Sequence, residues 1–501
     1  MASVASILSR APLGMQAPAV TVEVHVGEGL PSVSIVGLPE TAVKESKERV
    51  RSALVTSNYQ FPDGRVIVSL APADLPKEGG RYDLPIALGL LVASGQVSAR
   101  MLQGCEFYGE LSLTGELRPV RGVLPAVCQA AHSGNRVVVP TANLAEAALV
   151  RNARVAGASH LVEVCAHVSG DHPLAFARAP GPVGELPCYP DLRDVRGQAN
   201  ALRALEIAAA GAHSVLMIGP PGSGKSMLAH RLPGILPPMT EAEALQTASL
   251  LSVSARGFSP SDWGRRPFRA PHHTASAAAM VGGSSPPRPG EVSLAHNGLL
   301  FLDELPEFQR RVLEVLREPL ETGTICISRG ARQAEFPARF QLVAAMNPCQ
   351  CGYLGDPEGA CRCTSAQIRQ YRSRLSGPLL DRIDLHVEVP RLALSELGAS
   401  GRETEASTVV GARVMAARER QLGRSGKANS TLSAQELEKS ALITRPAQQL
   451  VEIALSQLRW SARAYHRVLR VAVTIADLAG AERIEPAHVA EAIQLRRALS
   501  S

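Results

Sequence analysis

The chain has 501 residues, 45% of them hydrophobic and 20% charged, and carries a formal net charge of +6 at pH 7. This length exceeds what one hydrophobic core normally supports, so we expect two or three domains. The longest apolar run, near residues 84–93, is too short to cross a bilayer, and the first residues lack a secretory signal. We therefore expect a cytoplasmic protein with no membrane segment.

Residues 1–168 have the pattern of one α/β domain. Residues 19–38 alternate apolar and polar side chains on both sides of a Gly-rich turn, which predicts a hairpin with one buried face. Beyond it, helical and strand patterns alternate along the chain. The helices are predicted at residues 40–57, 83–94 and 122–133, and the strands at 65–70, 107–113 and 136–140.

A Pro- and Gly-rich stretch, residues 169–192, is predicted to be a linker to a second α/β domain at 193–395. That domain opens with a helix at 198–210 and a strand at 214–219. A polar, Ser/Gly-rich stretch at 391–435 indicates a connector around one helix. From residue 446 to the end the pattern is helical, and Glu485-Pro486 marks one helix start.

The segment GPPGSGKS lies between the predicted strand and a helix beginning at Lys225, and it matches the phosphate-binding pattern GxxxxGK[ST]. Its glycines let backbone amides surround phosphates, Lys225 neutralises their charge, and the Ser226 hydroxyl can ligate Mg²⁺. The sequence thus predicts a site for ATP and Mg²⁺ formed by Gly219, Pro220, Pro221, Gly222, Ser223, Gly224, Lys225 and Ser226.

Two later apolar strands deliver polar side chains at their ends. Residues 298–302 run into Asp303, predicted to hold Mg²⁺, and Glu304, predicted to orient or deprotonate the attacking water. Residues 340–346 run into Asn347, which can hold the same water in line. With the phosphate-binding loop upstream, we interpret these residues as catalytic rather than as ordinary turns.

Five long segments make the chain resemble the ComM/YifB family, in the magnesium-chelatase-like branch of the AAA+ ATPases. The resemblance covers nearly the whole chain. It implies an AAA+ P-loop core, a C-terminal helical lid at 396–501, and a ring, usually a hexamer, with ATP between subunits. The segments are 269–283 (RAPHHTASAAAMVGG), 289–308, 336–352 (FPARFQLVAAMNPCQCG), 376–390 (SGPLLDRIDLHVEVP) and 461–478.

The same resemblance implies roles for two arginines. Arg382, in LLDRIDL, matches the arginine finger that reaches the neighbouring subunit's γ-phosphate, and Arg374 is a second candidate. Arg463, in SARAYHR, matches the sensor arginine of the lid. Such arginines can stabilise charge on the γ-phosphoryl oxygens, whereas the alternative for each is a surface salt bridge. Val473 stands where the family usually has a further lid arginine.

Residues 1–168 resemble the proteolytic domain of Lon. The position of Lon's catalytic Ser is Arg81, and that of its Lys is Leu124. Without a hydroxyl and an amine, acyl transfer cannot begin, so we expect no peptidase activity. The domain is better interpreted as an assembly or nucleic-acid-guiding module. Lys77, Arg81 and Arg118 could form a basic patch, and a solvated face is the alternative.

Two segments of the core, residues 265–288 and 327–339, are rich in Arg and His and poor in acidic residues. By resemblance they correspond to insertions facing the ring channel, where they would contact a phosphate backbone without reading bases. Solvated connections or subunit contacts are the alternative. The family resemblance implies an ATP-dependent DNA motor, a hexameric helicase that promotes branch migration in recombination during natural transformation, with recombination proteins as further partners.

Another function class stays open. The branch also suggests a magnesium-chelatase-like remodeller of a protein partner or of a metal-insertion complex. The Lon-like domain and a four-cysteine loop are features of the ComM/YifB family rather than of chelatase subunits, which disfavours that alternative. An ATP-dependent protease is disfavoured by Arg81 and Leu124.

The four-cysteine loop is NPCQCGYLGDPEGACRC, in which two CxC pairs are separated by nine residues. Four thiolates can close a tetrahedral Zn²⁺ site that is structural, although zinc knuckles usually have CxxC spacing. Thioredoxin-like redox chemistry would likewise need CxxC spacing, and a disulfide is disfavoured in the reducing cytosol. We favour structural zinc over free thiols at Cys349, Cys351, Cys361 and Cys363. The other five cysteines are interpreted as ordinary positions: Cys105, Cys128, Cys165, Cys188 and Cys326.

Overall fold

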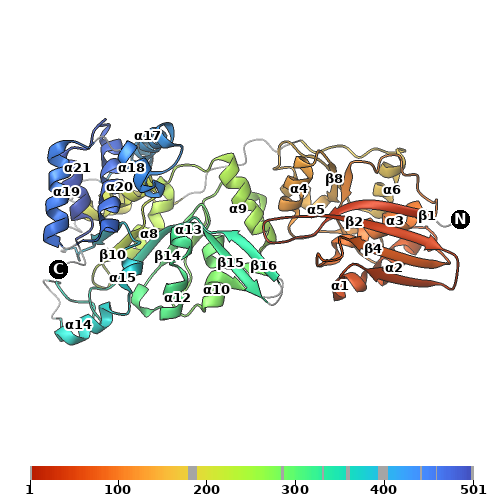
Figure 1. Cartoon of the computed structure of the whole chain (residues 1–501), viewed down its shortest axis with the longest axis horizontal. Coiled ribbons are helices and arrows are strands. Elements are labelled where there is room, and N and C mark those ends of the chain that lie inside the picture. The colour runs from red at the N-terminus through yellow and green to blue at the C-terminus, as the bar shows by residue number, and fades with distance from the viewer. Residues whose placement is uncertain are drawn as a thin grey trace.

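The computed structural model describes residues 3–178, 189–283, 287–329, 332–356, 361–392, 404–440, 443–458 and 460–497. The chain is elongated, with the N-terminal unit at one end, the C-terminal helices at the other and the P-loop core between them (Figure 1). Residues 179–188, within the predicted linker, lie outside the described part. In the described part, no helix combines the length and apolar character needed to cross a membrane.

The N-terminal unit is built on a seven-stranded mixed sheet with the order β3-β4-β2-β1-β5-β8-β9. β1 runs antiparallel to β2, and β5, β8 and β9 continue the sheet in parallel. The strands are β1 Ser3–Arg10, β2 Ala19–Gly27, β3 Ser32–Val36, β4 Arg65–Ala71, β5 Cys105–Phe107, β8 Arg136–Pro140 and β9 Arg154–Ala158.

The hairpin predicted at residues 19–38 is wrong, although both of its strands exist. β4 lies between them, antiparallel to β2 and parallel to β3. A strand has only two hydrogen-bonding edges, and β1 and β4 occupy both edges of β2. Alternating side chains identify the buried face of a strand, but they do not identify its neighbour.

Six helices of this unit match or extend the predicted pattern: α1 Thr41–Lys44, α2 Ser46–Thr56, α3 Asp83–Ala93, α4 Val123–His132, α5 Thr141–Ala147 and α6 Leu161–Ser169. α3 packs against β1 and β2. A Cβ on Gly89 would lie 2.4 Å from Val24 Cγ2, so glycine allows this helix to approach the sheet. Two short strands, β6 Glu110–Leu111 and β7 Leu117–Arg118, form a separate hairpin.

The core contains a five-stranded parallel sheet with the order β11-β14-β17-β10-β18. Alternate residues of its strands enter two different hydrophobic clusters, one on each face of the sheet. Because both faces are buried, the strand sequences are continuously apolar. Three strands confirm the predicted ones: β10 Val215–Ile218, β14 Leu299–Leu302 and β17 Gln341–Met346. The sequence did not predict the two edge strands, β11 Phe268–Arg269 and β18 Leu385–Glu388.

Helices cover both faces of this sheet, and two small hairpins extend from it (Figure 1). The helices are α7 Ala199–Gly211, α8 Lys225–Arg231, α9 Glu241–Val253, α10 Ala277–Val281, α11 Glu291–Leu294, α12 Arg310–Val315, α13 Pro319–Thr322, α14 Ser365–Arg372 and α15 Gly377–Leu380. The hairpins pair β12 Gly282–Gly283 with β13 Arg288–Pro289, and β15 Thr324–Arg329 with β16 Arg332–Pro337.

The C-terminal part is helical: α17 Ser407–Ser425, α18 Ala434–Ser440, α19 Arg445–Leu458, α20 Ala462–Ala479 and α21 Pro486–Gln494. The start predicted at Glu485-Pro486 is confirmed. The helix predicted within residues 391–435 is confirmed as α17, but the prediction that this region is a connector is wrong for its described part, because α17 packs on α7 and α20. Its buried Val410, Val414 and Ala417 follow helical spacing, which the surrounding polar residues obscured.

Among the described residues, the N-terminal unit contacts α9 of the core and the β15–β16 hairpin. Ala248 of α9 joins the hydrophobic cluster of Tyr108 and Leu124. The turn after β1 reaches the β15–β16 hairpin, where a Cβ on Gly14 would lie 3.3 Å from Ala334 Cβ. A cavity of about 450 Å³ lies along this junction and is lined in part by Arg81.

Buried His296, just after α11, makes the stability of the core sensitive to acid. Its Nδ1 accepts the backbone N–H of Arg339 at 3.0 Å, and its Nε2 lies 3.3 Å from the Gln246 amide oxygen, so the ring is neutral. Burial, followed by the nearby Arg339 charge, lowers the pKa of His296 from 6.5 to about 4. At pH values between about 4 and 6.5, His296 therefore binds a proton in the unfolded chain but not in the folded core.

We expect this difference to cost about 2 kcal/mol of folding free energy when the pH falls from 7 to 5. His296→Gln should reduce the pH dependence by that amount, measured as the urea unfolding free energy at both pH values. His132→Gln, at an exposed histidine, is the control. Equal pH dependence in the wild type and His296→Gln would contradict the assignment.

Candidate nucleotide and metal sites

The phosphate-binding loop connects β10 to α8. Gly222 and Gly224 have φ angles of +77° and +92°, which side chains with a Cβ rarely adopt. A Cβ on Gly219 would lie 2.0 Å from the Val389 carbonyl oxygen, so glycine is needed where the loop passes β18. The loop thus has the backbone freedom that wrapping around phosphates requires.

Lys225 lies at the first position of α8 and is buried. Its Nζ donates to the carbonyl oxygens of Gly219 at 2.7 Å and Pro220 at 2.8 Å, and to Asn347 Oδ1 at 3.2 Å. Burial lowers the pKa of Lys225, and the charges of Asp303 and Glu304 oppose that shift. The ammonium group is therefore held among oxygen atoms, where it can exchange carbonyl partners for phosphate oxygens.

Ser226 and Asp303 meet although they are far apart in the sequence. Ser226 Oγ donates to Asp303 Oδ2 at 2.6 Å. A hydroxyl and a carboxylate side by side next to a phosphate-binding loop are ligands that suit Mg²⁺. The residues present therefore fit ATP with Mg²⁺, which would neutralise phosphate charge when bound.

Glu304 follows Asp303 in an unusual backbone conformation. Its φ is +53°, in the left-handed region, and its N–H donates to Asp303 Oδ1 at 2.9 Å. Non-glycine residues in this region are often found at functional sites. The Glu304 side chain is 57% exposed, and its Oε2 lies 3.3 Å from His273 Nδ1.

We expect the contact with His273 to restrain the Glu304 carboxylate. His273→Ala should raise basal ATP turnover about fivefold, because the released contact is worth about 1 kcal/mol. Steady-state phosphate release measures this change. His272→Ala is the control, since His272 instead bonds the Thr274 hydroxyl at 2.9 Å. A large fall in turnover would instead make His273 part of the catalytic machinery.

Asn347 lies at the end of β17, next to the end of β10. Ile218 and Met346 are paired residues of these strands, so the loops that follow them leave the same edge of the sheet. Besides the Lys225 contact, the Asn347 backbone faces the hydroxyl of buried Tyr371 in α14 and partly offsets the rise that burial causes in the pKa of that hydroxyl. The structure thus brings Asn347, Lys225, Ser226 and Asp303 together, as the sequence predicted.

Arg382 pairs with Glu321 of α13, and the charge of Arg463 acts on the same carboxylate. Arg382, with a side chain 8% exposed, pairs with Glu321 and also donates to the Pro378 carbonyl at 2.6 Å. The bond from Arg382, with a smaller contribution from the Arg463 charge, lowers the pKa of Glu321. In the described part of the chain, no contact joins either arginine to the P-loop, and Arg382 is held by Glu321.

Arg374, the second candidate finger, is more exposed. Its side chain is 46% exposed and pairs with Glu307 at 2.8 Å. Glu307 lies on the short turn that follows Glu304. Val473 is buried in the hydrophobic cluster shared by the core and the C-terminal helices, so it offers no polar contact there.

Sequence reasoning missed a buried ionic cluster centred on Asp384, just before β18. Arg467 of α20 donates to Asp384 Oδ1 at 2.6 Å and to the Arg382 carbonyl at 3.0 Å. His213 Nδ1 lies 3.1 Å from Asp384 Oδ2. The spacing of Arg463 and Arg467, one helical turn apart, was the available signal. The cluster holds the C-terminal helices to the core beside Arg382.

Lys77, Arg81 and Arg118 form neither the basic patch nor the solvated face that the sequence left open. Lys77 and Arg81 are buried, and only Arg118 is largely exposed, at 61%. Lys77 donates to the Pro72 carbonyl, and Arg81 donates to the carbonyls of Arg10 and Arg121. Both cations serve as internal hydrogen-bond donors, since a buried cation needs such partners. Leu124, the other altered position, lies in the hydrophobic core.

The basic segments at 265–288 and 327–339 are partly neutralised. Arg266 donates to the carbonyls of Pro237 and Asn297, and Arg269 binds both oxygens of Glu291 at 2.7 Å. Arg265, Arg288 and Arg339 are exposed. Residues 284–286 and 330–331 lie outside the described part of the chain.

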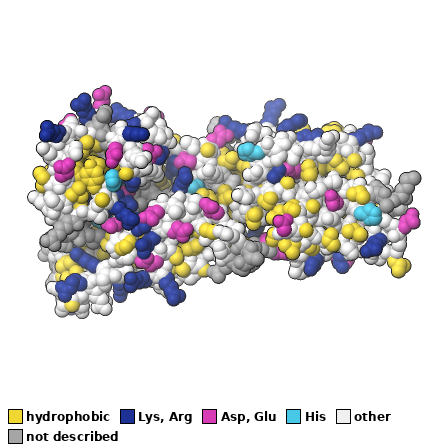
Figure 2. All heavy atoms as spheres, viewed as in Figure 1, with side chains coloured by type: hydrophobic (Ala, Val, Ile, Leu, Met, Phe, Trp, Pro, Cys, Tyr) yellow, Lys and Arg dark blue, Asp and Glu magenta, His cyan; other side chains and the backbone are white. Residues whose placement is uncertain are grey.

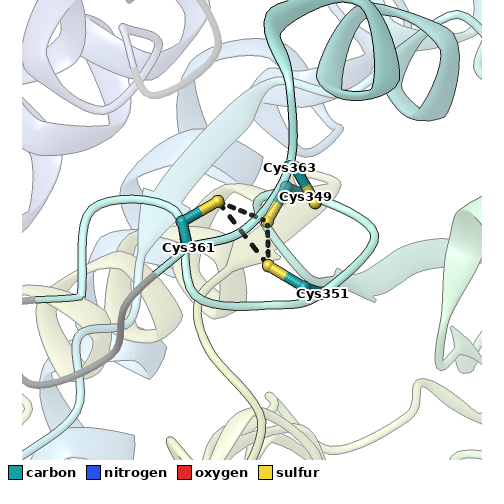
Figure 3. A group of neighbouring side chains, drawn as sticks. All are labelled: Cys349, Cys351, Cys361 and Cys363. Carbon is teal, nitrogen blue, oxygen red and sulfur yellow. Dashed lines mark hydrogen bonds between the residues drawn. The ribbon is translucent and has the colours of Figure 1, made fainter.

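The four loop cysteines point toward one another from two stretches of backbone (Figure 3). Cys349 Sγ lies 3.4 Å from Cys351 Sγ and 3.7 Å from Cys361 Sγ, and the latter two are 3.6 Å apart. All four sulfurs lie within 4.8 Å of one another, and these residues could hold a metal ion. The backbone N–H groups of Tyr353 and Arg362 lower the pKa of Cys351 to about 6.

The whole chain can be compared with known proteins. It is 48% identical to the competence protein ComM of Haemophilus influenzae, over 99% of this chain and 97% of that protein. The chain belongs to the ComM/YifB family. It is also 48% identical to protein YifB of Salmonella typhimurium, with the same coverage, and 42% identical to a Mycobacterium tuberculosis protein over 97% of each chain.

Three segments of this ComM/YifB chain match family models of magnesium chelatase. Residues 191–397 match "Magnesium chelatase, subunit ChlI", residues 22–143 match "Subunit ChlI of Mg-chelatase", and residues 404–496 match its C-terminal part. The magnesium-chelatase-like family is of AAA+ type, which supports ATPase activity and the use of ATP and Mg²⁺ by the residues described above.

Proposed function

We propose that this ComM/YifB chain is an ATP-dependent, ring-forming DNA motor, a hexameric helicase that promotes branch migration in recombination during natural transformation. The observation that carries the ATPase part is the convergence of Lys225, Ser226, Asp303 and Asn347 at one sheet edge. The DNA part draws support from the H. influenzae relative, which is named a competence protein. The proposed cofactors are ATP, Mg²⁺ and a structural Zn²⁺, and the proposed compartment is the cytoplasm.

In this proposal the catalytic residues divide between two subunits. Glu304 and Asn347 act on the attacking water in one subunit, and Asp303 with Ser226 holds Mg²⁺. Arg382 would reach the γ-phosphate of the neighbouring subunit after exchanging Glu321 for phosphate oxygens, and Arg463 would act on the same phosphate. The half-exposed Glu321, at 52%, gives a partner that can be released, unlike the buried carboxylate Asp384.

Exposed arginines supply the charge that a phosphate backbone would contact. Lys and Arg side chains recur along the lower left edge of the molecule, around α12 and α14 (Figure 2). Exposed residues of these segments include Arg310, Arg311, Arg362 and Arg369. Contacts of this kind are independent of base sequence and weaken with salt. We propose DNA binding that is sequence-independent and prefers single-stranded or branched substrates.

The test is strand displacement from a labelled forked or three-way-junction DNA by purified protein with ATP. The wild type should move the strand, and Glu304→Gln should bind the DNA without moving it. Intact ATP turnover with no strand movement would refute the helicase function. ATP turnover stimulated by a protein partner and not by DNA would favour the magnesium-chelatase-like remodeller, the alternative suggested by the family models.

The Lon-like N-terminal unit fits this proposal as an assembly or guiding module without peptidase activity. Its altered positions, Arg81 and Leu124, are both buried and have no nucleophilic group. A casein-degradation assay with ATP should show no cleavage.

A further inference from the structure

The sulfur positions of the cysteine loop match a closed four-thiolate metal site. A Zn–S bond of about 2.3 Å gives sulfur separations of roughly 3.8 Å in a tetrahedron. The separations among Cys349, Cys351 and Cys361 are 3.4–3.7 Å, and Cys363 completes the group within 4.8 Å. All four are free thiols, so none is consumed by a disulfide. Four sulfur ligands and tetrahedral geometry favour Zn²⁺ and leave no position for a reactive water.

The two CxC pairs lie at the two ends of one loop. Cys349 comes two residues after Asn347, at the end of β17. Cys363 directly precedes Thr364, whose hydroxyl accepts the N–H of Gln367 and caps α14. A metal held by both pairs therefore fixes the end of β17 to the start of α14.

The same loop touches the phosphate-binding loop. Gly352 has a φ of +88°, and a Cβ placed on it would lie 2.6 Å from Pro221 Cδ and 3.8 Å from Asn347 Cγ. From α14, the hydroxyl of buried Tyr371 faces the Asn347 backbone. Asn347 in turn holds Lys225. The cysteine loop is thus one wall of the nucleotide site, bounded by Pro221 and Asn347.

We propose that the four cysteines bind one Zn²⁺ per chain and that the bound metal positions Asn347 against the P-loop, so that ATP hydrolysis depends on the metal while ATP binding does not. The four thiols release their protons as the thiolates coordinate the metal, and no oxidant or reductant is needed. The metal is redox-inert and acts through the loop. Its positioning role rests on the ATPase function proposed above.

The experiment compares full-length wild type with Cys351→Ser/Cys361→Ser, and uses Cys326→Ser, at an exposed cysteine outside the cluster, as the matched control. Zinc is measured by elemental analysis, and Co²⁺ added to metal-free protein reports thiolate coordination by absorption. We expect about one zinc per wild-type chain and per control chain, and almost none in the double variant. Absence of zinc and of a cobalt–thiolate spectrum in the wild type overturns the metal site.

The positioning role is tested by separating kcat from KM for ATP. The double variant should lose about tenfold in kcat, while KM for ATP changes less than about threefold. A loss of this size is typical when a group that supports a site, without touching the reacting atoms, is removed. Gly352→Ala should keep its zinc and also lower kcat, because its new Cβ would displace Pro221. An unchanged kcat in zinc-free protein overturns the positioning role, and so does a joint collapse of kcat, KM and thermal stability.

Failure of the proposed ATPase function gives a different result. A zinc-loaded wild type that hydrolyses no ATP would overturn both that function and the positioning role, while the zinc and cobalt measurements, which need no ATP, would still decide the metal site.

Discussion

Replacing Glu304 by Gln is expected to lower ATP turnover by about 10²–10⁴-fold while ATP still binds. The amide keeps the size of the side chain but cannot accept the proton of the attacking water, and a positioned base typically contributes a factor of this size. Lys225, Ser226 and Asp303 stay in place, because their contacts do not involve the Glu304 side chain. Turnover is measured by phosphate release and binding by a fluorescent ATP analogue.

Two companion variants make the result specific. Lys225→Ala should lose ATP binding itself, because it removes the ammonium group from the phosphate site. Glu307→Gln alters a neighbouring carboxylate that pairs with Arg374, and it should keep turnover within about threefold, since an exposed ion pair is worth little. If Glu304→Gln keeps wild-type turnover, the base must be another group.

Replacing Asp384 by Ala should have the largest effect on stability. Asp384 is buried and holds Arg467 and His213. Removing it leaves Arg467 without its carboxylate partner at the junction of the core and the C-terminal helices, and losing one member of a buried ion pair costs about 3–5 kcal/mol in measured cases. The expected result is a urea transition of the C-terminal part at markedly lower concentration. Trp460, packed against the shared cluster, provides a fluorescence signal.

Asp381→Ala is the matched control, because Asp381 is 49% exposed and lies 3.7 Å from Arg496. It should change the transition by less than about 1 kcal/mol. The bonds from His213 and the charge of Arg467 lower the pKa of Asp384 against the opposing effect of burial, which is the largest. Its contribution is therefore present above the unfolded pKa near 4 and is lost only as the pH falls below it. Similar transitions for both variants would contradict this role.

Much of the nucleotide site could be predicted because its chemistry lies in contiguous residues. A strand, a glycine-rich turn and a helix start give Lys225 and Ser226 nearly fixed positions, and apolar runs that end in Asp303 and Asn347 mark strand ends. Parallel strands place such ends at one edge of the sheet. The cysteine cluster was equally visible, since its four ligands lie within one loop.

The errors in predicting the hairpin at residues 19–38 and the connector at 391–435 had a different cause. Periodicity reports which face of an element is buried and not which element covers it. β4 could therefore enter between β2 and β3 unseen. Likewise, the buried side of α17 was hidden within a polar segment, because its buried residues are few and include the polar Gln421 beside Val410, Val414 and Ala417.

By itself, the sequence determined the P-loop, the paired carboxylates, the strand-end asparagine and the four thiols, because local backbone geometry fixes each of these. Only the tertiary structure decided which residues restrain them. His273 meets Glu304, Arg382 pairs with Glu321, and Gly352 packs on Pro221. These contacts join segments far apart in the chain, and their distances depend on strand order and on how the loops pack, which no local pattern encodes.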